Sequence, residues 1–127
     1  MREGADGEDR GNPGDFASLI EAFLVRRTRE RLTRGQVNSN RRALFLLLSA
    51  VRRRLAVDDA RPIPVTAVTL EDLLSVLAGL REKGRANGTV SSYASAFRLF
   101  FGDLHDRGLL LFDPARRLPS ISEDHLP

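Results

Sequence analysis

Hydrophobic residues recur at helical spacing in four stretches of the chain, separated by short polar segments. The first stretch follows Asp15, a candidate N-cap, and ends in a basic run at 26–31. The second follows Thr33 and should end near 55–58, because the prolines of 61–65 cannot continue a helix. We interpret this proline segment as a stiff link within one domain. The predicted core positions of these two helices are Phe16, Leu19, Ile20, Phe23, Leu24, Val37, Leu44, Leu47, Leu48, Val51 and Leu55.

The third stretch carries the clearest local signal, a capping box with Thr69 as N-cap and Asp72 at N3. Its helix should stop at Gly84. A fourth helix is expected from about 87–89 to Gly108, with Asn87 or Thr89 as its cap. The predicted core positions of these helices are Leu70, Leu73, Leu74, Leu77, Leu80, Val90, Ala94, Phe97, Phe101 and Leu104.

A short closing turn over 115–118 should follow Asp113 and Pro114, which have the N-cap and N1 pattern. No stretch alternates as a half-buried strand does. The sequence therefore predicts an all-α domain of four helices.

The length of 127 residues fits one domain, which we place at 15–118, with a tail at 119–127. Residues 1–14 are acidic and glycine-rich, and they are expected to be disordered. They lack the apolar region of a signal peptide, and no apolar run is long enough for a membrane helix. Because there is no cysteine, disulfides and thiol chemistry are excluded. These observations predict a cytoplasmic protein.

The charge is unevenly distributed, although the net value is only +3. Lys83 is the single lysine among 20 basic residues, a bias that a GC-rich genome would also produce. Ten arginines nevertheless lie between Arg26 and Arg54 against one acid, Glu30, whereas the first fifteen residues carry five acids. A basic centre favours a polyanionic partner, nucleic acid before membrane.

Two polar segments open the second and fourth helices, at 33–42 and 85–93. Their arginine, amide and hydroxyl side chains are of the kinds that contact phosphate oxygens and base edges. Helix N-termini add free N–H groups that favour phosphate. Capping alone would explain Thr33 and one of Asn87 or Thr89, but not the polar residues further into the helices. The candidate DNA-binding residues are Arg34, Gln36, Asn38, Ser39, Arg41, Arg42, Arg85, Asn87, Thr89 and Ser92.

A catalytic constellation is not evident in the sequence. The two histidines, His105 and His125, cannot form a metal cluster together, and Glu71 and Asp72 have a dipole role at a helix start. The glycines of 84–88 lack the preceding strand of a phosphate-binding loop. We expect no catalytic residue, metal, cofactor or small-molecule substrate for this chain.

The fourth helix resembles the last long helix of the core-binding domain of tyrosine recombinases, the phage-integrase family. The residues that carry the likeness are Thr89, Val90, Ser95, Ala96, Phe97, Arg98, Phe100, Phe101, Leu104 and Gly108. The segment 113–115, Asp-Pro-Ala, is similar to the Asn-Pro-Ala that follows in the family, and 68–74 and 36–47 resemble its third and second helices. Asn40 departs from the pattern, because the family usually has an aromatic residue there, and so do Gln36 and 87–88.

The resemblance covers 16–118 and implies an orthogonal four-helix, SAM-like bundle with a short C-terminal helical turn. It further implies a domain that forms one jaw of a clamp around duplex DNA, with the second and fourth helices across the major groove. The other jaw would carry the catalytic arginines, lysine, histidines and tyrosine, which this chain lacks. The implied partners are double-stranded DNA and other recombinase protomers, with the chain on the nucleoid when bound.

A helical protein-interaction domain without DNA binding is the alternative interpretation. It depends on apolar residues beyond those that the core requires, namely Phe45, Leu46, Leu99 and Leu109–Phe112.

Overall fold

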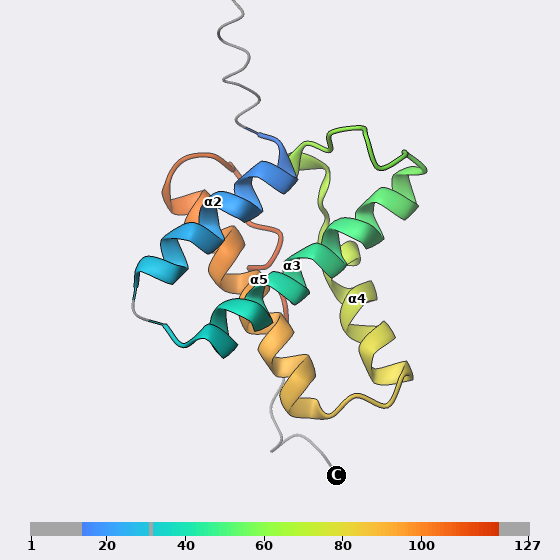
Figure 1. Cartoon of the computed structure of the whole chain (residues 1–127). Helices are drawn as coiled ribbons and strands as arrows, with labels where there is room; N and C mark the ends of the chain where they lie inside the picture. Colours follow the sequence, from blue (N-terminus) through green and yellow to red (C-terminus); the bar gives the residue numbers. More distant parts are fainter. Residues whose placement is uncertain (1–13, 31, 120–127) are drawn as a thin grey trace, which may run out of the picture.

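The computed structural model describes residues 14–30 and 32–119, and in them the chain forms four α-helices (Figure 1). These are α2 (Phe16–Arg29), α3 (Arg34–Leu55), α4 (Leu70–Glu82) and α5 (Asn87–Asp106), with a 3₁₀ turn, η1 (Val65–Ala67), before α4. The described residues contain no strand, so the all-α prediction is confirmed. The predicted acidic segment lies outside the described residues up to position 13, and the predicted tail lies outside them from 120 onward.

Three of the four helices begin at the predicted cap. The carboxylate of Asp15 accepts a hydrogen bond from the N–H of Ser18 at 3.0 Å. The hydroxyls of Thr33 and Thr69 each accept from the N–H of the N3 residue, and the N3 side chain accepts from the cap N–H in return. Asp72 therefore completes a capping box in place of the usual Glu or Gln.

The start of α5 differs from the prediction, since neither Asn87 nor Thr89 caps it. Ala86 is the N-cap, with φ −65° and ψ 153°, and it makes no side-chain hydrogen bond to the helix. Asn87 is already the first helical residue, which gives it the wrong backbone conformation for a cap. The first turn of α5 thus lacks a side-chain cap among the described residues.

The core lies where α3 contacts the other three helices, with α5 also packed against α4. In Figure 1 α3 and α5 cross near their labels. All five predicted core positions of α5 are fully buried, and they are Val90, Ala94, Phe97, Phe101 and Leu104. Four rings, those of Phe16, Phe23, Phe100 and Phe101, form a cluster between α2 and α5.

Two predicted core leucines are instead exposed. Leu55 is the last residue of α3, and the chain turns away from the core at Ala56, which has φ 57°. In α4 the buried stripe follows Leu73, Val76, Leu77 and Leu80, so Leu74 lies at its edge and is 36% exposed. Leu55 is exposed because α3 extends beyond the surface that its neighbours cover, and Leu74 because the neighbours of α4 cover a narrower face than the leucine pattern indicates.

The proline link is part of the fold. The N–H of Phe16 donates to the carbonyl of Ile63 at 2.8 Å, and the N–H of Val65 donates to that of Gly14 at 2.7 Å. These two bonds flank a bridge between Asp15 and Pro64, and both Ile63 and Val65 are buried. The link therefore fastens the start of α2 to the segment that leads into α4.

The predicted C-terminal helical turn consists of two successive hydrogen-bonded turns. Arg116 N–H donates to the carbonyl of Asp113, and Leu118 N–H to that of Ala115, both at 3.1 Å. Ala115 and Leu118 are buried against the core. Arg98 of α5 then donates to the carbonyls of Leu118 and Pro119, at 3.3 and 2.7 Å, which fixes the direction of the chain at the last described residue.

Asp72 is one of two buried polar residues in the described chain, and Arg54 of α3 is its ionic partner. The guanidinium donates to both carboxylate oxygens, at 2.6 and 2.8 Å, and the N–H of Thr69 donates at 2.9 Å. Burial alone would raise the pKa of Asp72, but the bonds from Arg54 and Thr69 outweigh it, and the pKa lies below the usual value.

We expect Asp72→Asn to reduce the free energy of unfolding at pH 7 by about 1.5–3 kcal/mol, the range for a hydrogen bond to a charged group. Because the pKa of Asp72 is lower in the folded state, the ionised carboxylate contributes fully to the free energy of unfolding at any pH above its unfolded pKa of about 3.9. This contribution is lost as the pH falls through the folded-state pKa, so the difference in unfolding free energy between wild type and Asp72→Asn should shrink in acid. Urea unfolding between pH 7 and pH 3 would measure this, with Glu71→Gln, an exposed acid on the same helical turn, as control. Parallel stability curves for wild type and Asp72→Asn would contradict the assignment.

Candidate nucleic-acid interface

The two polar segments predicted to bind DNA lie side by side in the folded chain. The hydroxyls of Ser39 on α3 and Ser92 on α5 are 3.1 Å apart, although 53 positions separate them in sequence. In Figure 1 the N-terminal ends of both helices lie in the lower part of the view. We call the surface formed by 33–42 and 85–93 the α3–α5 face.

Each of the ten candidate residues has side-chain or backbone atoms at the surface. Seven are exposed, and they are Arg34, Gln36, Asn38, Arg41, Arg42, Arg85 and Ser92. Three are half-buried, and they are Ser39, Asn87 and Thr89. All ten residues are thus accessible, and the two helix starts that carry them are neighbours at Ser39 and Ser92. The capping role expected of Asn87 or Thr89 is not fulfilled.

The α3–α5 face is basic, because its two segments contain arginines and no aspartate or glutamate. Within the described chain, Arg34, Arg42 and Arg85 form no ion pair. Arg41 lies 3.9 Å from Glu21, but both side chains are about half exposed, so solvent screens the attraction. These guanidinium groups can therefore donate to an external anion.

Gln36 has a structural role that the sequence analysis did not assign to it. Its side-chain oxygen accepts from the N–H of Thr33 at 2.9 Å and lies 3.2 Å from the Thr33 hydroxyl. A glutamine needs both its oxygen and its amide nitrogen to read adenine in a bidentate manner. In this conformation Gln36 offers only its N–H groups to a ligand.

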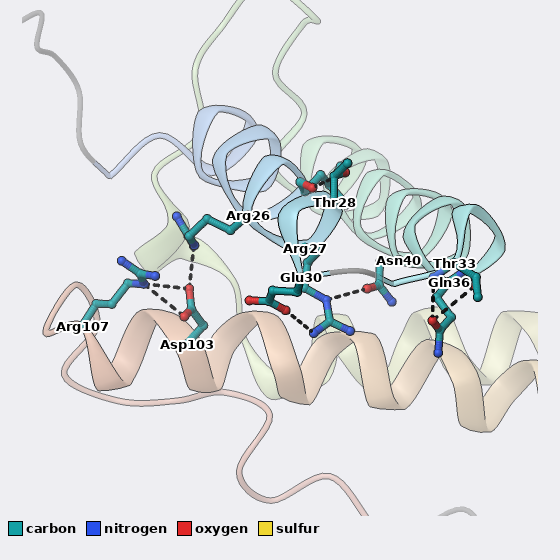
Figure 2. Close-up of polar contacts among 10 residues, drawn as sticks. Arg26, Arg27, Thr28, Glu30, Thr33, Gln36, Asn40, Asp103 and Arg107 are labelled. Carbon is teal, nitrogen blue, oxygen red and sulfur yellow. Dashed lines mark hydrogen bonds and ion pairs between the residues drawn. The ribbon is translucent and has the colours of Figure 1, made fainter.

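Asn40 and Arg27 form a contact that was also missed (Figure 2). Asn40 is only 8% exposed, and its side-chain oxygen accepts from Nε of Arg27 at 3.3 Å. Arg27 also donates to Glu30 at 3.2 Å and lies over the ring of Phe23. The contact fastens the end of α2 to the residue next to Ser39. The sequence contained a signal for this contact. Asn40 lies on the apolar stripe between Val37 and Leu44, and a buried amide there needs a hydrogen-bond partner.

A second polar cluster joins α2 to the C-terminal half of α5. Arg26 lies 2.6 Å from Asp103, and Arg107 donates to the same carboxylate at 3.0 Å (Figure 2). Arg26 and Arg27 are therefore occupied within the protein. The basic run that ends α2 contributes to the structure in these two positions, whereas Arg34, Arg42 and Arg85 of the α3–α5 face form no ion pair within the described residues.

The other candidates for chemistry within the described residues are the histidine and acidic side chains outside the α3–α5 face. They contain no group of three or more histidine, cysteine or acidic side chains placed to hold a metal ion. Nδ1 of His105 lies 3.0 Å from the carbonyl of Leu110, a contact that supports the loop after α5. None of the helices in this part of the chain has the length and apolar character to cross a membrane.

The geometry thus combines exposed arginines, hydroxyls and amides at two adjacent helix starts. Comparison of the chain with family models, with curated proteins and with solved structures found no match.

Proposed function

We propose that this chain binds double-stranded DNA through the α3–α5 face. The observation that carries the proposal is the contact between Ser39 and Ser92, which unites two acid-free segments into one basic surface. Either segment alone would be an ordinary polar helix start. Together they present arginines from both segments, with Arg85 just ahead of α5, beside polar side chains that can reach bases.

The contacts divide into two kinds. We assign phosphate contacts to Arg34, Arg41, Arg42, Arg85 and Thr89, helped by the N–H groups at the starts of both helices. We assign contacts in the major groove to Asn38, Ser39 and Ser92, with Gln36 and Asn87 as donors at the edge of the face. A major groove about 12 Å wide admits one helix, so the neighbouring helix would follow the phosphates.

The resemblance to tyrosine recombinases supports a more specific role, that of the N-terminal clamp domain of a site-specific recombinase. The SAM-like arrangement and the partner protomers are part of this proposal. DNA cleavage would then require a catalytic domain supplied elsewhere in the protein, and this chain would act as a binding module on the cytoplasmic nucleoid.

The direct test is fluorescence anisotropy of a labelled duplex of about 30 base pairs at several salt concentrations. The logarithm of the binding constant should fall by about 0.9 per log unit of salt for every phosphate neutralised. A slope of several phosphates would support the proposal. An absence of binding even at low salt would contradict it for the isolated chain.

Two single variants test the assignment of the face. Arg42→Ala should weaken binding to every duplex, because a phosphate contact carries no sequence information. Ser39→Ala should weaken binding unevenly between duplexes of different sequence. Arg61→Ala, an exposed arginine of the link at the far end of α3, is the matched control and should leave affinity unchanged. Unchanged affinity in both test variants would show that the face is wrong.

The alternative, a protein-interaction domain, has one observation in its favour. Leu111 and Phe112 are 85% and 83% exposed, unusually high for large apolar side chains. Phe45 and Leu46, which the alternative also invoked, are instead half-buried and packed against the core. Tight self-association without any affinity for DNA at low salt would favour this function over the first.

A further inference from the structure

The loop that carries Leu111 and Phe112 is held in place on both sides. Leu110 is buried, and its carbonyl contacts His105 of α5. After the two exposed residues, a carboxylate oxygen of Asp113 accepts from the N–H of Ala115 at 2.8 Å. The two apolar side chains are therefore displayed by a fixed backbone, and their exposure is not a consequence of fraying.

A cleft of about 690 Å³ lies beside this loop. Its apolar walls are Leu70, Leu111, Phe112 and Pro114, and its polar walls are Arg116, Arg117, His105 and one acid, Asp113. Neither arginine forms an ion pair within the part of the chain that the structure describes. Two arginines outnumber the one acid, whose carboxylate already accepts from the N–H of Ala115, so a complementary occupant is both apolar and acidic.

We propose that residues 120–127 of the same molecule occupy this cleft. The segment has the matching composition, since Ile121 and Leu126 are apolar and Glu123 and Asp124 are acidic. Its apolar side chains would cover Leu111 and Phe112, while the two acids would face Arg116 and Arg117. This inference goes beyond the proposed function and does not depend on it.

The point where the chain leaves the described structure allows this contact. Pro119 is bound to Arg98 on α5. His105, which lines the cleft, lies seven residues further along the same face of that helix, about 10 Å away. Eight extended residues span up to about 28 Å, so the segment reaches the cleft from Pro119 with chain to spare.

A second copy of the chain fits the cleft less well. In a two-fold contact the same patch meets itself, so Arg116 and Arg117 of both copies would come close together. Like charges across such a contact oppose association. The charge of the cleft therefore favours the acidic segment over a symmetric dimer.

Backbone ¹⁵N NMR of the intact chain tests the proposal. In the wild type we expect order parameters for 121–126 close to those of the helices, about 0.8, falling below about 0.6 in the Ile121→Ser, Leu126→Ser double variant. The same variant should shift the amide signals of Leu70, Leu111 and Phe112. The matched control, Ser120→Ala with Ser122→Ala, should change neither.

The reciprocal variant, Phe112→Ser, replaces an exposed side chain, so the fold should be retained. It should release 121–126 to order parameters below about 0.6. Low order parameters for this segment in the wild type would overturn the proposal. Amide shifts at the cleft that vary with protein concentration would also overturn it, in favour of a second copy.

Discussion

Phe100→Ala is expected to lower the free energy of unfolding by about 3–5 kcal/mol, the usual cost of deleting a buried aromatic ring. The ring of Phe100 is fully buried and lies 5.3 Å from that of Phe23 and 4.9 Å from that of Phe101, both edge-on. It also contacts Phe16 at 5.9 Å. Its removal leaves a cavity that the rings of two helices border, and neither helix can move inward without disturbing the other contacts.

Urea unfolding followed by circular dichroism measures this loss. Leu99→Ala is the matched control, because Leu99 is the preceding residue of α5 and is 44% exposed. Leu99→Ala should lower the free energy of unfolding by well under half as much as Phe100→Ala. Equal losses in the two variants would mean that the ring cluster is not the centre of the core.

The second large expected effect is a loss of affinity for duplex DNA. A triple variant, Arg34→Ala, Arg42→Ala and Arg85→Ala, should reduce the salt slope of duplex binding by about 2.7. The reason is that these three guanidinium groups have no acidic partner within the described chain and are free to neutralise phosphates. Affinity at low salt should fall by about tenfold or more. Arg41 is left unchanged, because Glu21 lies near it.

A second triple variant, Arg61→Ala, Arg116→Ala and Arg117→Ala, removes the same charge from exposed positions outside the α3–α5 face. It should retain most of the salt slope. If both triple variants lose affinity equally, binding depends on net charge alone, and the α3–α5 face has no special role. Circular dichroism should show the same helical content in all three proteins.

Much of the fold could be predicted because its signals are local. A cap such as Thr69 and its partner Asp72 are three residues apart, and the apolar stripe of α5 repeats within one helix. The helix starts at Asp15, Thr33 and Thr69 and the burial of the whole α5 stripe follow from such short-range patterns. The polar segments of the candidate site could be identified for the same reason.

The remaining features depend on contacts between distant parts of the chain. The meeting of Ser39 with Ser92 is a result of how α3 crosses α5, which no local pattern specifies. Whether Leu74 or Val76 is buried depends on which side of α4 its neighbours cover. The capping box formed by Thr33 and Gln36 could have been predicted, because the two residues have the required spacing of three positions.

The bridge between Asp15 and Pro64 has a consequence for the order of folding. It closes a loop of about 50 residues, and closing a chain of that length costs roughly 3 kcal/mol of entropy beyond a constant. Two hydrogen bonds contribute less than that in an open chain, so we expect α2 and α3 to be packed together before the bridge forms. We therefore expect the bridge to form late in folding, after α2 and α3 have met, and to fasten the segment that leads into α4 onto this helical hairpin.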